Sequence, residues 1–141
     1  MSAGEGHREG GPGRFSALAE DECRDLLRTH TIGRIGFAAS EGPTILPVSY
    51  ALQANRIVFR TAAGGVLAEL EHGRPVAFEV DDFDTQTQTG WSVLVRGTTD
   101  VPVELRELSG PLPIPWASGV RDQVICLSLD SVSGRIVARE D

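Results

Sequence analysis

Short runs of β-branched and aromatic residues, separated by turn residues, make up most of the chain after residue 30. Apolar runs of about four to eight residues bounded by Gly, Pro, Asn and Asp are typical of strands. The pattern therefore predicts a mainly β protein. The predicted strands are Ile32–Ala39, Thr44–Ala51, Arg56–Thr61, Pro75–Val80, Trp91–Val103, Val124–Leu129 and Gly134–Ala138.

The turns between the early strands are short, as at Ser40–Pro43 and Gln53–Asn55. Turns of this length join antiparallel neighbours, whereas a parallel arrangement needs a long crossover. So many antiparallel strands in a small domain favour closure into a barrel, because closure removes exposed sheet edges.

Two helices are expected beside the strands. Leu18–Arg28 carries apolar residues among acidic ones, and Ser16 is a candidate N-cap. Gly64–His72 has apolar positions at helical spacing and predicts a short helix between strands. The Pro-rich segment Leu108–Gly119 is expected to be a loop, because proline cannot donate to a sheet ladder.

The first 15 residues are rich in glycine and polar residues, a composition that buries too little apolar surface to offset the entropy of ordering. We interpret residues 1–15 as a flexible arm and residues 16–141 as a single domain. With 40% hydrophobic and 23% charged residues, the 141-residue chain has the composition of a globular protein. Oligomerisation commonly adds buried surface in domains of this size, so a homodimer is expected.

Charge and residue inventory exclude several classes of protein. The net charge of −7 argues against nucleic acid, which requires a basic surface. All 13 basic residues are arginine, so neither a Schiff-base lysine nor a P-loop lysine is present. Cys23 and Cys126 form no CxxC pair, so neither a zinc site nor a disulfide framework is expected, and a reducing cytoplasm fits this pattern. No apolar run is long enough to span a membrane.

No acid–base or metal constellation stands out. His7 lies in the predicted arm, and His30 and His72 are isolated near predicted helix ends. Three carboxylates follow one strand, which we interpret as a solvated acidic turn rather than a metal site: Asp81, Asp82 and Asp84. Any chemistry would then come from a bound cofactor.

One segment has the pattern of a phosphate site. Arg60 and Thr61 end a strand and are followed by small residues and Gly65. An arginine fork, a hydroxyl and backbone N–H groups freed by glycine can together bind a phosphate at a helix start. The alternative is an exposed strand arginine followed by an ordinary glycine turn.

Six blocks in order resemble the pyridoxamine 5′-phosphate oxidase-like, FMN-binding split-barrel proteins of actinobacterial type. The resemblance extends from about Leu18 to Ala138. The blocks are Thr31–Phe37 (TIGRIGF), Pro47–Tyr50 (PVSY), Ile57–Thr61 (IVFRT), Val76–Asp81 (VAFEVD), Gly90–Gly97 (GWSVLVRG) and Ser133–Ile136 (SGRI). The resemblance implies an antiparallel split barrel and a homodimer with FMN at sites formed by both subunits.

The resemblance also implies roles for particular residues. Arg60 and Thr61 would hold the phosphate, Ser92 would reach the flavin of the other subunit, and Trp116 would border the substrate. We expect Trp91, beside Ser92, to be a barrel or interface residue. The isoalloxazine ring and ribityl chain would lie along Leu46, Pro47, Val48, Ser49 and Tyr50.

Two positions depart from the family pattern. Where the family usually has a basic residue near the phosphate, after Gly65, this chain has Val66, which would weaken FMN binding roughly ten- to a hundredfold. The C-terminal block lacks the histidine of the vitamin B6 oxidases, so we do not predict vitamin B6 oxidation.

The expected function is flavin-mediated hydride or electron transfer to a small substrate. The alternative is a non-catalytic dimeric binding protein that has lost the flavin or binds heme or deazaflavin F420 instead. The long anionic tail of F420 would need more basic residues than this acidic chain offers, and heme would need His30 or His72 as an axial ligand.

Overall fold

The computed structural model describes residues 13–61, 65–101 and 123–139. Within these residues, two helical segments and eight strands follow one another. In order they are β1 (Gly13–Ala17), α1 (Glu20–Thr29), β2 (Ile32–Ala39), β3 (Gly42–Gln53), β4 (Arg56–Thr61), the 3₁₀ helix η1 (Val66–His72), β5 (Pro75–Asp84), β6 (Thr89–Asp100), β7 (Gln123–Ser128) and β8 (Ser131–Arg139).

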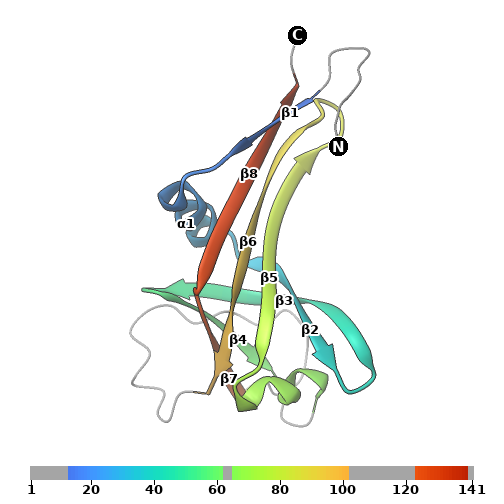
Figure 1. The fold of residues 1–141 in the computed structure, drawn as a ribbon, viewed down its shortest axis with the longest axis vertical. Coiled ribbons are helices and arrows are strands. Elements are labelled where there is room, and N and C mark those ends of the chain that lie inside the picture. The colour runs from blue at the N-terminus through green and yellow to red at the C-terminus, as the bar shows by residue number, and fades with distance from the viewer. Residues whose placement is uncertain (1–12, 62–64, 102–122, 140–141) are drawn as a thin grey trace.

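Every strand pairs antiparallel with its neighbours. The order β6-β5-β2-β3-β4-β7 closes on itself because β7 also pairs with β6. This closed six-stranded barrel confirms the predicted antiparallel split barrel. Beyond it, β8 and β1 extend the sheet from β6, and the long strands β5, β6 and β8 rise away from the barrel beside α1 (Figure 1).

Strand β3 is longer than the predicted Thr44–Ala51 because it serves two neighbours. Its first part pairs with β2, from Ala39↔Gly42 to Ile32↔Ser49. Its last four residues pair with β4. Strand β3 is therefore shared between β2 and β4, and its side chains continue from one of these pairings to the other.

The core lies inside the barrel, where strand residues alternate between buried and exposed positions. Gly33 lies directly over the ring of Phe78, and a Cβ at this position would collide with that ring. Both α1 and β8 extend the core through Cys23, Leu27 and Val132.

Several predicted boundaries differ from the structure. Residues 13–15, assigned to the arm from composition, begin strand β1, because they pair with Val137–Arg139 of β8; residues 1–12 lie outside the described part. Ser16 lies in β1 and is not the helix N-cap. The cap position is Ala19, whose N–H donates to the Glu22 side chain at 2.8 Å.

The acidic turn is also a strand. The prediction that the chain turns at Asp81–Asp84 was wrong, because β5 continues to Asp84 and pairs with β6 as far as Thr89. The predicted helix between strands is present as the 3₁₀ segment η1. The Pro-rich loop at 108–119 lies outside the described residues.

Candidate functional site

The side chains that alternate with the core residues form a second surface of the sheet, which we call the outer face. It runs across the strands from β3 to β1. By register, the outer face consists of Ile45, Pro47 and Ser49 on β3, Ile32 and Arg34 on β2, Glu79, Asp81 and Phe83 on β5, Ser92, Leu94 and Arg96 on β6, Ser133 and Arg135 on β8, and Phe15 on β1.

The predicted β3 residues divide between the two faces of the strand. Val48 and Tyr50 are buried in the core, Leu46 packs against it, and Pro47 and Ser49 lie on the outer face. The alternation of β3 gives this division directly. The side chains of Pro47 and Ser49 are therefore the members of the predicted set that a ligand on the outer face would meet.

Arg60 is placed by the pairing of β4 with β7. It lies opposite Val124, and the neighbouring pair on the same face is Val58 with Cys126. These three apolar side chains are buried and form a small cluster of their own, outside the main core. Within the described residues, the Arg60 Nε atom is buried and has no hydrogen-bond partner.

Ser49 and Arg60 lie on the same face. They flank the pair Tyr50↔Phe59, in which both side chains point into the core. Residues next to a cross-strand pair point to the opposite side from it. The structure thus brings together one residue predicted to contact the ring and one predicted to hold the phosphate.

The remaining phosphate residues are placed through their backbone. Thr61 ends β4 opposite Gln123, Gly65 precedes η1, and Val66 is the first residue of η1. Because η1 is a 3₁₀ helix of seven residues, its aligned peptides contribute less than the expected α-helix would. Trp116 lies outside the described residues.

Ser92 lies on a part of β6 that is remote from Arg60. It pairs with Asp81 of β5 and Arg135 of β8, whereas β6 meets β7, the strand next to β4, only at its far end, at Thr99 and Asp100. On the other side, β5 and β2 separate β6 from β3. Within one chain the structure therefore does not bring Ser92 together with Arg60 or Ser49.

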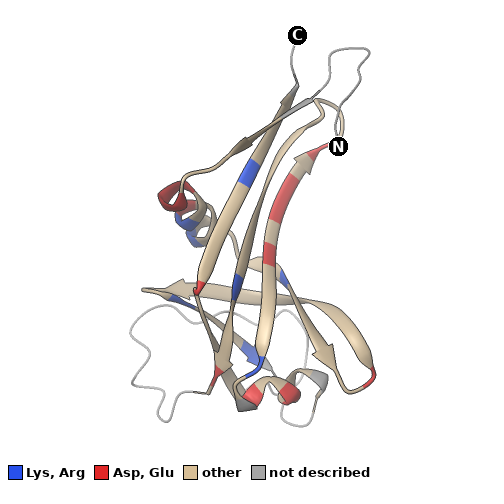
Figure 2. Cartoon of the chain, viewed as in Figure 1, with Lys and Arg blue, Asp and Glu red and all other residues tan. Residues whose placement is uncertain are grey.

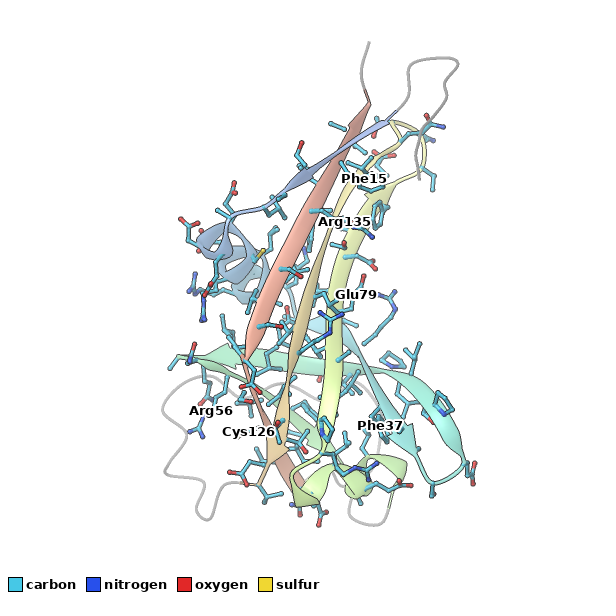
Figure 3. The ribbon with its side chains drawn as sticks, viewed as in Figure 1. Phe15, Phe37, Arg56, Glu79, Cys126 and Arg135 are labelled. Carbon is cyan, nitrogen blue, oxygen red and sulfur yellow. The ribbon has the colours of Figure 1, made fainter. Side chains whose placement is uncertain are left out.

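Ser92 instead lines a pocket of about 550 Å³ on the outer face. The labelled side chains of Phe15, Arg135 and Glu79 follow one another along the long strands on this side of the molecule (Figure 3). The pocket lining is Phe15, Ser16, Ala17, Glu79, Ser92, Leu94, Ser133, Gly134 and Arg135.

An acidic cluster lies next to this pocket. Carboxylates gather along the upper part of β5, while β8 carries a basic residue (Figure 2). Arg34 Nη1 lies 3.4 Å from Glu79 Oε1 and 3.5 Å from Asp81 Oδ2. Partial burial and the neighbouring Asp81 carboxylate raise the pKa of Glu79 to about 7, and Arg34 opposes them.

His30 is held at the end of α1. Its Nδ1 lies 2.8 Å from the Leu26 carbonyl oxygen, and its ring meets Trp91 edge to face at 4.8 Å. Trp91 is half-buried against the core. Its indole thus packs within its own chain, as expected for a barrel residue, and His72 has no described side chain.

Sequence reasoning missed three outer-face residues of this region. Ile45 is 72% exposed on the strip that Pro47 and Ser49 continue. Glu79 and Arg135 line the pocket with Ser92. Strict alternation along β3 and β5 would have predicted the face of Ile45 and Glu79. The shared pocket could not be predicted in this way, because it forms only where β1, β5, β6 and β8 lie side by side in the sheet.

One family model matches most of the chain. Residues 19–136 match the pyridoxamine 5′-phosphate oxidase family. The uncharacterized protein Rv0080 of Mycobacterium tuberculosis is 34% identical over 130 residues, which cover 86% of this chain and 85% of that protein.

Two solved structures of similar fold are each 27% identical to this chain. The FAD binding protein of Mycobacterium smegmatis is 27% identical, with a TM-score of 0.67 over 87% of this chain and 98% of that one. The protein DIP1874 of Corynebacterium diphtheriae, of unknown function, is 27% identical, with a TM-score of 0.68 over 89% of this chain and 98% of that one.

Proposed function

Because the chain belongs to the pyridoxamine 5′-phosphate oxidase family, we propose that it binds FMN in a groove formed by two copies and acts as a flavin-dependent oxidoreductase on a small substrate. The proposal draws on the family match, on the FAD binding relative from Mycobacterium smegmatis and on the geometry at the end of β4.

The buried Nε of Arg60 is the observation that carries the proposal. Within the part of the chain that the structure describes, this donor has no hydrogen-bond partner. A buried donor left unpaired is costly, so such groups usually mark a missing partner. A phosphate would accept from the guanidinium through two oxygens, and Gly65 follows a few residues later along the chain.

The row of β3 side chains leads from Arg60 across the outer face. Ser49 lies on the same side as Arg60, and Pro47 and Ile45 follow at alternate positions. Exposed apolar side chains on a rigid strand form a flat surface that suits one face of an aromatic ring system. We assign Pro47, Ser49 and Ile45 to the ring and ribityl side, and Arg60 to the phosphate.

The same face supports the proposed homodimer. Ile45, Phe83 and Ile32 lie on it and are 72%, 52% and 37% exposed in the single chain. Large exposed apolar groups on one face indicate an interaction surface. A second copy would cover them and would bring its own Ser92 toward the β3 strip, in line with the expectation that Ser92 serves the other subunit.

When bound, the flavin would supply hydride and electron transfer, chemistry that the side chains themselves do not offer. Arg60 would fix the anionic end of the ligand, and the apolar β3 side chains would exclude water from one face of the ring. Strand residues are well suited to this task because the ladder with β2 and β4 holds them rigidly.

The last part of the proposal concerns subcellular localisation. Among the described residues, no helix is long and apolar enough to cross a membrane. Cys23 is buried as a free thiol, and free thiols persist in reducing compartments. We propose a cytoplasmic protein.

The test is a flavin titration of the purified protein, followed by its visible spectrum. We expect saturable FMN binding at micromolar concentration and a stable dimer by light scattering. FAD, F420 and heme are titrated in parallel. A protein that binds none of the flavins saturably would refute the proposal, and saturable binding of heme or F420 alone would favour the non-catalytic or deazaflavin alternative.

A further inference from the structure

A pocket lined by both a cation and apolar side chains lies on the outer face, away from Arg60. We infer that this pocket binds a small planar carboxylate through Arg135. At about 550 Å³ the pocket has the size of a small-molecule site. Its walls come from β1, β5, β6 and β8, so the fold rather than a single loop shapes it.

Arg135 is preorganised for an anion. Its Cζ atom lies 4.9 Å from the centre of the Phe15 ring, in cation–π geometry. This contact holds the guanidinium but leaves its N–H donors available. Among the described residues, no carboxylate forms an ion pair with Arg135. The guanidinium therefore presents an unused bidentate site to the pocket.

The rest of the lining defines the class of anion. Phe15, Ala17 and Leu94 provide apolar surface, and Ser92 and Ser133 provide hydroxyl groups. A planar ring fits beside the apolar side chains. The two serine hydroxyls can donate hydrogen bonds to the anion that Arg135 binds.

The charge of the ligand is limited by Glu79, which lines the same pocket. The charged groups around Glu79 are Asp81 on its own strand, Arg34 on β2, Arg96 on β6 and Arg135 on β8. Arg34 already pairs with Glu79 and Asp81, which leaves Arg135 as the cation for the ligand. A carboxylate with one negative charge is therefore favoured over a phosphate with two.

The role of this anion as substrate rests on the proposed function. Ser92 lines the pocket and is expected at the flavin of the other subunit. A carboxylate on Arg135 would then hold the remainder of the molecule next to that flavin.

The test uses the full chain and three matched probes: benzoate, benzamide and phenyl phosphate. Backbone amide NMR shifts at Ser92, Ser133 and Arg135 report binding. We expect saturable shifts with benzoate, and dissociation constants at least about fivefold weaker with uncharged benzamide and with phenyl phosphate. Equal affinity for either analogue, or no saturable shift at these amides with benzoate, would overturn the assignment.

Substitutions separate Arg135 from general charge effects. Arg135→Gln should weaken benzoate about tenfold or more, because it removes a charge-assisted pair of hydrogen bonds. Arg96→Gln removes a cation from the same face, outside the pocket lining, and should change the affinity less than about twofold. Equal losses in the two variants would contradict the inference. If Arg135→Gln does not fold, Arg135→Lys replaces it, with an expected intermediate loss from the missing planar fork.

Parallel FMN titration keeps the two proposals distinguishable. FMN binding without benzoate binding overturns this inference and leaves the proposed function intact. Benzoate binding at Arg135 in a protein that binds no flavin supports the carboxylate site and refutes the proposed function.

Discussion

The hydroxyl of Tyr50 donates a 2.7 Å hydrogen bond to the backbone carbonyl of Leu27, and both groups are buried. Leu27 lies in the last turn of α1, where carbonyls have no partner within the helix. The bond therefore completes the helix end and fastens α1 to β3, the strand that carries the candidate ring surface. Burial also raises the pKa of Tyr50 above its ordinary value of 10, so the hydroxyl stays a donor at physiological pH.

Replacing Tyr50 with Phe should destabilise the protein by about 1–3 kcal/mol, because the Leu27 carbonyl would be buried without a partner. Urea unfolding at a fixed protein concentration measures this loss. The matched control is Thr87→Val, which removes a hydroxyl whose 2.7 Å hydrogen bond to Thr89 is exposed and should cost less than about 0.5 kcal/mol. If the two substitutions lower the free energy of unfolding equally, the buried Tyr50 hydrogen bond contributes no more to stability than an exposed one.

Arg60→Ala should weaken FMN binding about ten- to a hundredfold and riboflavin binding much less, because riboflavin lacks the phosphate that Arg60 is proposed to hold. Fluorescence quenching of each flavin gives the two affinities. Arg56→Ala is the control, since Arg56 lies on the same face at the other end of β4. If FMN and riboflavin lose affinity equally, Arg60 acts on the fold rather than on the phosphate.

Val66→Lys should tighten FMN about ten- to a hundredfold, because it supplies the basic residue that the family resemblance implies at this position beside the proposed phosphate. Riboflavin affinity should stay the same. Val66→Met adds length without charge and serves as the control. An unchanged FMN affinity in Val66→Lys would mean that other donors of this chain already balance the phosphate.

Local sequence patterns predicted strands such as β2 well because they have one buried and one exposed face. Ile35 and Phe37 alternate with exposed residues in β2, and the predicted bounds of β2 and β4 agree with the structure. The ends of β5 could not be predicted in this way. Asp81 and Asp82 have low β-propensity, and only the full pairing with β6 keeps them in the strand.

The candidate site was predictable to the extent that it is local. Arg60, Thr61 and Gly65 are neighbours in sequence, and the resemblance to a family drew attention to them. Arg135 and Glu79 are 56 positions apart in the numbering and lie on strands separated by β6. Their common pocket depends on the sheet order, which no spacing along the chain encodes.

The Glu79 carboxyl should make stability depend on pH. Its pKa rises from 4.5 to about 7 in the folded chain, chiefly through burial and then through Asp81. Between these two values the folded state binds more protons than the unfolded state, so the free energy of unfolding should fall as pH rises from about 4.5 through 7. The side chain is 32% exposed, which limits the size of the effect through solvent screening.

Thermal unfolding between pH 5 and 8 tests this dependence, with roughly 0.5-unit steps and constant ionic strength. Glu79→Gln should flatten the decline, because the amide has no proton to lose in this range. Asp82→Asn, which removes an exposed carboxylate of the same strand, should leave the decline in place. Parallel profiles for the wild type and Glu79→Gln would show that Glu79 titrates near its ordinary pKa and that Arg34 outweighs Asp81.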